Sequence, residues 1–453
     1  MRDVANHVEV MLGEPHKAVL SMFVPVFIAL MIAQINIFVD TVWCSSLGID
    51  AMSAISTVSS IYFIIVGIGN GIGIGVNVAI SRRIGAGDFE GASKCASQTI
   101  IAMVLISLPI IPILYLTFDT LITGMGAGDV LEECRDYFIP IILLCTFTIL
   151  NGVLSGTFRG EGAAMTASKI NILAAVFNMI LDPILIFGLD MGLRGASCAT
   201  MISAIFAVAI SFVIYRNGGT AVKLRPSRLE KSILGDVFYV GFPQTAELFI
   251  MGAMNVVLIT FVLRCGGTEG LAVYGMPWNL ITLFMIPIHS FAASMVPVCS
   301  SAIGQNDASR LRSGYYFTTR AAIIVGIGLA LFIMVSAWGL LRIYTYSSGM
   351  DVYHDEMVHI LRIYALFLPF YGMIYVGSSM LSCLRKSPYA LMSSFLRNVL
   401  LIYLYALSST HTMEWIYWSL CIGEIIGGTF MMALAQWQFR IKYRKMTSGA
   451  VPA

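Results

Sequence analysis

Long runs of apolar residues, separated by short polar stretches, make up most of the chain. A helix needs about 20 apolar residues to cross the hydrocarbon layer of a membrane. Runs of that length occupy residues 19–43, 54–80, 96–118, 137–157, 164–188 and 195–215. A second set occupies residues 236–263, 271–297, 314–341, 357–383, 388–408 and 415–439. This pattern predicts an all-α membrane protein with twelve transmembrane helices.

The longest polar stretch lies between the two sets of runs, from Arg216 to Gly235. It is rich in basic residues and has the character of a cytoplasmic linker. We therefore expect an N-lobe at residues 1–215 with helices one to six, a linker at 216–235, and a C-lobe at 236–453 with helices seven to twelve.

The distribution of charge predicts the orientation. Most of the 27 Lys and Arg residues lie at the two termini and in the even-numbered loops. The odd-numbered loops carry only Arg135, Arg194, Arg264 and Arg342, beside several acids. Because basic loops stay on the cytoplasmic side, both termini are expected there, in a plasma or inner membrane.

The two halves contain similar motifs at matching positions. The segment Ile84 to Asp88 (IGAGD) follows the second helix, and Ile303 to Asp307 (IGQND) follows the eighth. Six helices per half is an even number, so both halves have the same orientation. We expect two pseudo-symmetric six-helix lobes around an axis along the membrane normal, with a cavity between them that suits alternating access.

Composition excludes a soluble globular protein and most enzyme classes. Apolar residues make up 58% of the chain and charged residues only 11%, against about 45–50% and 25% in soluble domains. The nine cysteines form no CxxC pair, so neither a disulfide framework nor a zinc site is indicated. The chain contains no Walker motif, no HExxH and no recognisable triad. We therefore predict no catalytic residues and no cofactor.

Acidic residues inside membrane helices are the strongest functional signal. A charge at the centre of such a helix costs about 2.5–3.5 kcal/mol on insertion scales. Asp40 and Asp182 are both expected in the outer half of the membrane, on helices that run in the same direction. Asn36 and Asn178 each precede an acid by one turn, and Thr200 is expected in the outer third of the sixth helix.

Two carboxylates, an amide and a hydroxyl at one depth predict a cation site. Such oxygen ligands suit Na⁺ or a proton shared between acids. The alternative is that Asp40 and Asp182 pair with Lys or Arg, or reach the outer interface. Because no basic residue lies at matching depth on the first, fifth or sixth helix, the sequence favours the cation site. Pro183 supports it by freeing a backbone oxygen beside the acids.

Other polar residues are candidates for lining a substrate cavity. Tyr137 and Asn151 lie on the fourth helix, although Tyr137 also fits an interfacial anchor. Glu247, near the middle of the seventh helix, either faces the cavity or pairs with Arg397, and Glu424 is similarly ambiguous. The glycine-rich segment Gly67 to Gly75 does not fit a nucleotide loop and predicts close helix packing.

The chain resembles the multidrug and toxic compound extrusion (MATE) transporters of the wider flippase superfamily, nearest to their DinF-like branch, which is prokaryotic and archaeal. The motifs that carry the resemblance include Phe158 to Gly162 (FRGEG), Asn178 to Pro183 (NMILDP) and Gly195 to Thr200 (GASCAT). The resemblance implies a cation site at Asp40, Asn178, Asp182 and Thr200, with Tyr137 nearby.

The resemblance also implies an antiporter that exports amphipathic, often cationic organic compounds in exchange for H⁺ or Na⁺. A monomer is sufficient for that activity. The first alternative is a lipid or lipid-linked saccharide flippase, which should carry several cavity cations for diphosphate, whereas only Arg397 is a candidate. The second is a membrane-embedded transferase, for which the expected His or Asp clusters do not occur.

Overall fold

The computed structural model describes residues 2–345 and 350–448, and every regular element within them is helical. The elements are α1 (Arg2–Leu12), α2 (Pro15–Ser45), α3 (Ile49–Gly85), α4 (Phe89–Gly124), η1 (Gly128–Val130), α5 (Leu131–Gly160), α6 (Ala164–Pro183), η2 (Ile184–Gly188), α7 (Gly192–Arg216), α8 (Lys231–Gly304), α9 (Ala308–Thr345), η3 (Met350–Tyr353), α10 (His354–Ala365), α11 (Leu368–Cys383), α12 (Ser387–Ser408) and α13 (Met413–Thr447).

The twelve predicted membrane helices are confirmed. Eleven helical segments of the described residues are long and apolar enough to cross a membrane. The twelfth is the bent pair α10–α11, whose two parts meet at 44° and together match the predicted helix at 357–383. The helix α8 contains two spans, Lys231–Gly267 and Glu269–Gly304, because Gly267 adopts a left-handed φ of 62° between them.

The helices extend beyond the predicted apolar runs. The first span begins at Pro15 rather than near residue 19, and α8 begins at Lys231, inside the predicted linker. An apolar run marks only the part of a helix that lies in hydrocarbon, whereas its polar end turns remain helical in the headgroup region. The short helix α1 was not predicted, because it is too short and too polar to span a membrane.

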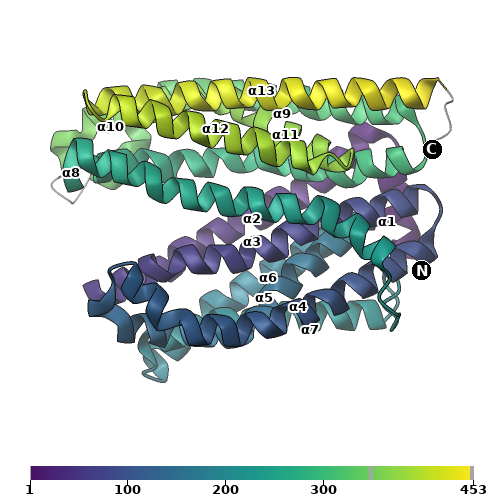
Figure 1. Ribbon diagram of the computed structural model, residues 1–453, viewed down its shortest axis with the longest axis horizontal. Helices are drawn as coiled ribbons and strands as arrows, with labels where there is room; N and C mark the ends of the chain where they lie inside the picture. The colour runs from purple at the N-terminus through teal and green to yellow at the C-terminus, as the bar shows by residue number, and fades with distance from the viewer. Residues whose placement is uncertain (1, 346–349, 449–453) are drawn as a thin grey trace. The chain divides into compact units, whose positions relative to one another are not determined.

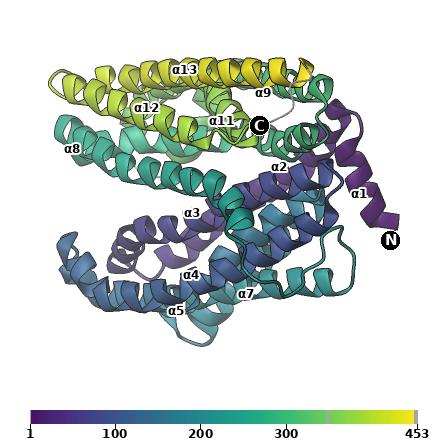
Figure 2. The same ribbon diagram turned by 45° about the vertical axis from the view of Figure 1, so that its right-hand side comes forward.

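The chain divides into two compact units, described separately here. The first comprises Met1–Glu14 with Val24–Phe249, and the second comprises Pro15–Phe23 with Ile250–Ala453. By this division the start of α8 packs with the first unit, while the lobe boundaries expected from the sequence stay a prediction. In the first unit α3 packs against α5, and α5 against α7 (Figure 1). In the second, α13 lies beside α11 and α12, which both views show (Figure 2).

Glycines allow α3 to approach two neighbours at backbone distance. A Cβ atom added to Gly69 or Gly73 would meet the backbone of α5, and one added to Gly71 or Gly75 would overlap with α8. The two pairs lie on different faces of α3. The predicted role of the glycine-rich segment in close packing is therefore confirmed.

The loop between α5 and α6 holds two other segments of the first unit. Glu161 is buried and accepts hydrogen bonds from the Val222 backbone N–H (2.9 Å) and the Tyr215 hydroxyl (3.5 Å). Gly162, at φ 86°, lies against the His7 carbonyl and the Met11 side chain of α1. This loop therefore fixes both α1 and the segment that leads to α8.

Burial raises the pKa of Glu161 from 4.5 to about 8, although its hydrogen bonds from the 221–222 backbone and Tyr215 act in the opposite direction. Between these two pH values the folded protein binds a proton at Glu161 that the unfolded chain releases. The resulting stabilisation is fully present below pH 4.5 and is lost as the pH rises towards 8.

We expect Glu161→Gln to remove this pH dependence, because the amide keeps an acceptor oxygen for Val222 but carries no charge. The melting temperature of the purified wild type should fall more steeply between pH 5 and pH 8 than that of the variant. Thermal unfolding across that range measures the difference. Glu132→Gln, which alters an exposed acid on α5, is the control and should retain the wild-type slope. Parallel slopes for wild type and Glu161→Gln would contradict the expectation.

Candidate cation site

Two neighbouring helices of the first unit, α2 and α6, bring the predicted acids together through a chain of amide hydrogen bonds. The Asn36 Nδ2 donates to Asp40 Oδ2 (3.2 Å) and to Asn178 Oδ1 (2.9 Å). The Asn178 Nδ2 in turn donates to Asp182 Oδ1 (3.2 Å). The spacing of one turn between each amide and its acid makes these bonds possible. Asn36, predicted from the sequence to stand one turn before Asp40 and to be a candidate cavity residue, is therefore the link between the two helices.

The two acids lie close enough to interact electrostatically. Two ionised carboxylates at neighbouring positions repel each other, so this arrangement favours a bound proton or cation. Within residues 2–345 and 350–448, no Lys or Arg forms an ion pair with either acid. The alternative that these acids pair with basic residues is therefore wrong.

Three buried oxygen atoms at this position accept no hydrogen bond from the described residues. They are Asn36 Oδ1, Asp40 Oδ1 and Asp182 Oδ2. A buried acceptor without a donor costs about 1–3 kcal/mol, and more when it is charged. Three such atoms on two touching helices are the arrangement that a bound cation would stabilise.

A small apolar cluster covers one end of the acids. Its buried members are Cys44, Ile186 and Ala196. Cys44 lies one helical turn after Asp40, and Ile186 lies one turn after Asp182. Ala196 lies one turn before Thr200. Because the three cluster residues touch, Thr200 is placed at the level of the acids and on the same side of α7. Its hydroxyl donates to the Ala196 carbonyl (3.1 Å), which leaves oxygen lone pairs available.

Two tyrosines complete the surroundings of the acids. Tyr137 of α5 packs against the apolar cluster and lies close enough to Asp40 and Asp182 to interact with them electrostatically. Tyr62 of α3 lies near both Asp40 and Tyr137. Sequence reasoning missed Tyr62, because a tyrosine within an apolar run carries no sign of which neighbour it faces.

The other polar candidates lie elsewhere in the first unit. Asn151 donates to Asn171 Oδ1 (3.4 Å), and Asn171 donates to Ser155 Oγ (3.2 Å). Asn171 stands two turns before Asn178 on α6, so these bonds extend the polar line along that helix rather than joining the acids. The predicted placement of Asn151 in the N-lobe agrees with this position.

Glu247 and Glu424 each have a hydrogen-bond partner within their own unit. Glu247 accepts a hydrogen bond from Gln244 Nε2 (2.9 Å), one turn before it on α8. Arg397 of α12 forms a buried ion pair with Glu424 of the adjacent α13, with 3.2 Å between Nη1 and Oε2. The predicted pairing of Arg397 with an acid is therefore confirmed for Glu424.

The backbone after the acids departs from regular helix geometry. Pro183 ends α6, and Ile184–Gly188 form a π-helical turn. Proline cannot donate to the carbonyl four residues earlier, so the regular bonding pattern is interrupted here. π-Helical turns of this kind occur frequently at functional sites.

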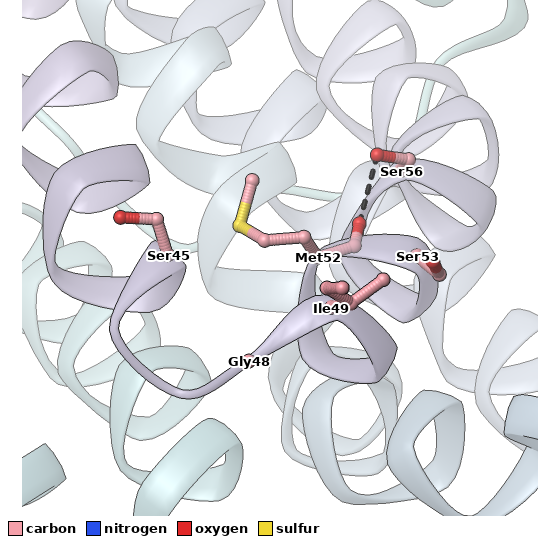
Figure 3. A pocket seen from close by; sticks show the side chains of 6 residues that line it. All are labelled: Ser45, Gly48, Ile49, Met52, Ser53 and Ser56. Atoms are coloured by element: carbon pink, nitrogen blue, oxygen red, sulfur yellow. Dashed lines mark hydrogen bonds between the residues drawn. The ribbon is translucent and has the colours of Figure 1, made fainter.

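A separate shallow pocket of about 410 Å³ lies at the turn between α2 and α3. Figure 3 shows Ser45 on one side of this turn and Met52, Ser53 and Ser56 on the other, joined through Gly48. The hydroxyls of Ser45 and Ser56 donate to Val42 and Met52 carbonyls of their own helices. The pocket therefore offers few free donors, and none of the predicted site residues lines it.

Comparison with known proteins identifies the family that this chain matches and relatives of similar length. The family model MatE matches residues 25–184 and 243–407. The multidrug export protein MepA of Staphylococcus aureus is 27% identical over 419 residues, which cover 90% of each chain.

Solved structures give the same result. A MATE structure in complex with MaL6 has a TM-score of 0.91 at 25% identity and covers 96% of this chain and 99% of its own. A MOP superfamily transporter from Pyrococcus furiosus has a TM-score of 0.90 at 25% identity and covers 97% and 99%. The predicted fold, two six-helix lobes of the MATE type, is therefore confirmed.

We expect Asn178→Leu to destabilise the first unit, because it leaves the Asn36 amide and Asp182 without their mutual partner. Hydrogen bonds between membrane helices contribute about 0.6 kcal/mol on average and at most about 1.7 kcal/mol. The loss should lie in that range and can be measured by thermal unfolding in detergent. Asn70→Leu, at an exposed position of α3, should be neutral. Equal stability of the two variants would show that the amide chain does not hold α2 to α6.

Proposed function

Because the chain belongs to the MatE family of membrane transporters, we propose that it is a secondary active multidrug exporter, driven by an inward gradient of H⁺ or Na⁺. The chain is a multi-pass membrane protein and a transporter rather than an enzyme. The substrates that we propose are amphipathic, often cationic organic compounds. The name of the MepA relatives, multidrug export protein, supports this assignment.

The observation that carries the proposal is the set of buried acceptor oxygens around Asp40 and Asp182. A cation or proton bound there would neutralise the acids and supply the missing donor or charge. Release of that ion would leave two carboxylates at one position with no basic partner, a state that is costly in a membrane interior. The two states of the site therefore differ strongly in free energy, as an energy-coupling site requires.

Ion binding can drive substrate export if the ion and the substrate stabilise opposite conformations of the protein. We propose that the ion binds from outside, draws α2 and α6 together through both acids, and thereby weakens the hold on substrate. The substrate leaves, the protein turns inward, and the ion is released to the cytoplasm. An ion can drive export in this way only to the extent that its affinity differs between the two conformations.

The residue chemistry assigns separate roles within the site. Asp40 and Asp182 bind the ion directly, while Asn36 and Asn178 orient the carboxylates through their N–H groups. Thr200 contributes a hydroxyl oxygen, and Na⁺ would use that oxygen and Asn36 Oδ1 in addition to the acids. A proton needs only the two carboxyl groups. Tyr137, Asn151 and Glu247 remain proposed cavity residues.

We expect Asp40→Asn and Asp182→Asn each to reduce gradient-driven dye efflux at least tenfold, because each removes a charge that ion binding must neutralise. Purified variants in proteoliposomes, with an imposed pH or Na⁺ gradient, provide the measurement. Thr200→Val separates the two ions, since it should impair transport driven by Na⁺ more than transport driven by H⁺.

Asp119→Asn is the matched control, because Asp119 is an exposed acid of α4 that pairs with Arg135. It should retain wild-type efflux. Melting temperatures of all variants test whether they fold. Wild-type efflux by a folded Asp40→Asn or Asp182→Asn protein would rule out the coupling role of that acid.

A further inference from the structure

The segment between α7 and α8 has no regular secondary structure and is hydrogen-bonded to the first unit at several points. We call residues 220–230 the linker arm. Two hydrogen bonds hold the start of the arm. The Thr220 hydroxyl donates to the Val222 carbonyl (2.8 Å), and the Val222 N–H donates to the carboxyl group of buried Glu161 (2.9 Å). The arm therefore leaves α7 from a defined point rather than as a free loop.

Three further backbone N–H groups of the linker arm donate to side chains of α4. The pairs are Lys223 N with Ser93 Oγ (3.0 Å), Arg225 N with Ser97 Oγ (2.9 Å), and Glu230 N with Gln98 Oε1 (2.9 Å). Ser93 and Ser97 are one turn apart, so the arm runs along the axis of α4. Because these hydrogen bonds use the backbone N–H groups of the arm, its basic side chains remain available for other contacts.

The length of α4 sets the depth of the arm in the membrane. Its 36 residues give a helix about 54 Å long, whereas the hydrocarbon layer is about 30 Å thick. Each end of α4 therefore extends about 12 Å beyond the hydrocarbon when the helix is centred. Ser93 and Ser97 lie about 6 Å and 12 Å along the axis from Phe89. The arm is thus held at the level of the lipid headgroups.

The arm presents net positive charge at this level, from three basic residues against the single acid Glu230. Lys223, Arg225 and Arg228 are exposed, and among the described residues none of them forms an ion pair. Leu229, 45% exposed, adds an apolar contact beside them. A fixed row of cations next to an apolar side chain matches an anionic headgroup above its acyl chains.

We propose that the linker arm binds the headgroups of anionic phospholipids through Lys223, Arg225 and Arg228, held in place by Ser93 and Ser97 of α4. Basic side chains near an anionic membrane surface contribute about 1 kcal/mol each, which corresponds to roughly fivefold in affinity. The hydrogen bonds to α4 reduce the ordering entropy that a free loop would lose on binding.

Native mass spectrometry of the full-length protein in detergent, titrated with phosphatidylglycerol or phosphatidylcholine, tests the proposal. The variant K223Q/R225Q/R228Q should bind phosphatidylglycerol at least tenfold more weakly than wild type, with phosphatidylcholine binding unchanged. The variant S93A/S97A keeps every charge but removes two anchors of the arm. It should bind phosphatidylglycerol several-fold more weakly, an effect that a merely electrostatic patch would not show.

The matched control is R440Q/R444Q/K445Q, which removes three exposed basic residues at the end of α13 in the second unit. It should retain most of the wild-type affinity for phosphatidylglycerol. Wild-type affinity in K223Q/R225Q/R228Q, or an equal loss in the control, would overturn the proposal. Unchanged binding by S93A/S97A would overturn the part assigned to the anchors on α4.

Discussion

A pair of neighbouring carboxyl groups, with no basic partner among the described residues, is the constraint on which the first unit depends. In an apolar interior, two such groups are tolerated only if something positive accompanies them or if they bind protons. The amides of Asn36 and Asn178 supply one N–H group to each acid, and the apolar cluster at Cys44 closes one end. These features offset only part of the free-energy cost of burying the two carboxyl groups. Because the rest of that cost remains, binding of a cation or proton at this position is favoured.

The close packing of α3 provides the rigidity that such a site requires. Its glycines bring α5 and α8 to backbone distance on separate faces, so Tyr62 of α3 and Tyr137 of α5 are held beside Asp40 by the main chain. In a membrane, helix association depends on such close contact because lipid provides no hydrophobic force between helices. Small residues far from the acids therefore determine how accurately the acids are placed.

The sequence was sufficient for the helices and for the acids, because both depend on strong one-dimensional signals. An apolar run of spanning length has few alternatives, and an acid within it is unusual enough to identify. The amide link through Asn36 was less accessible, since it depends on which faces of α2 and α6 meet. Tyr62 carried no signal at all. The ion pair of Arg397 with Glu424 depended on which helices are neighbours, which residue spacing along the chain does not reveal. The helix α1 was missed because hydropathy detects only spans.

The π-helical turn at Ile184–Gly188 has a consequence for how motion spreads from Asp182. Such a turn holds one residue more than an α-helical turn, so the chain beyond Gly188 is out of phase with the helix that carries the acid. A twist of α6 can be taken up in this wider turn by a local exchange of backbone bonds. The short connection to α7 then need not rotate with α6.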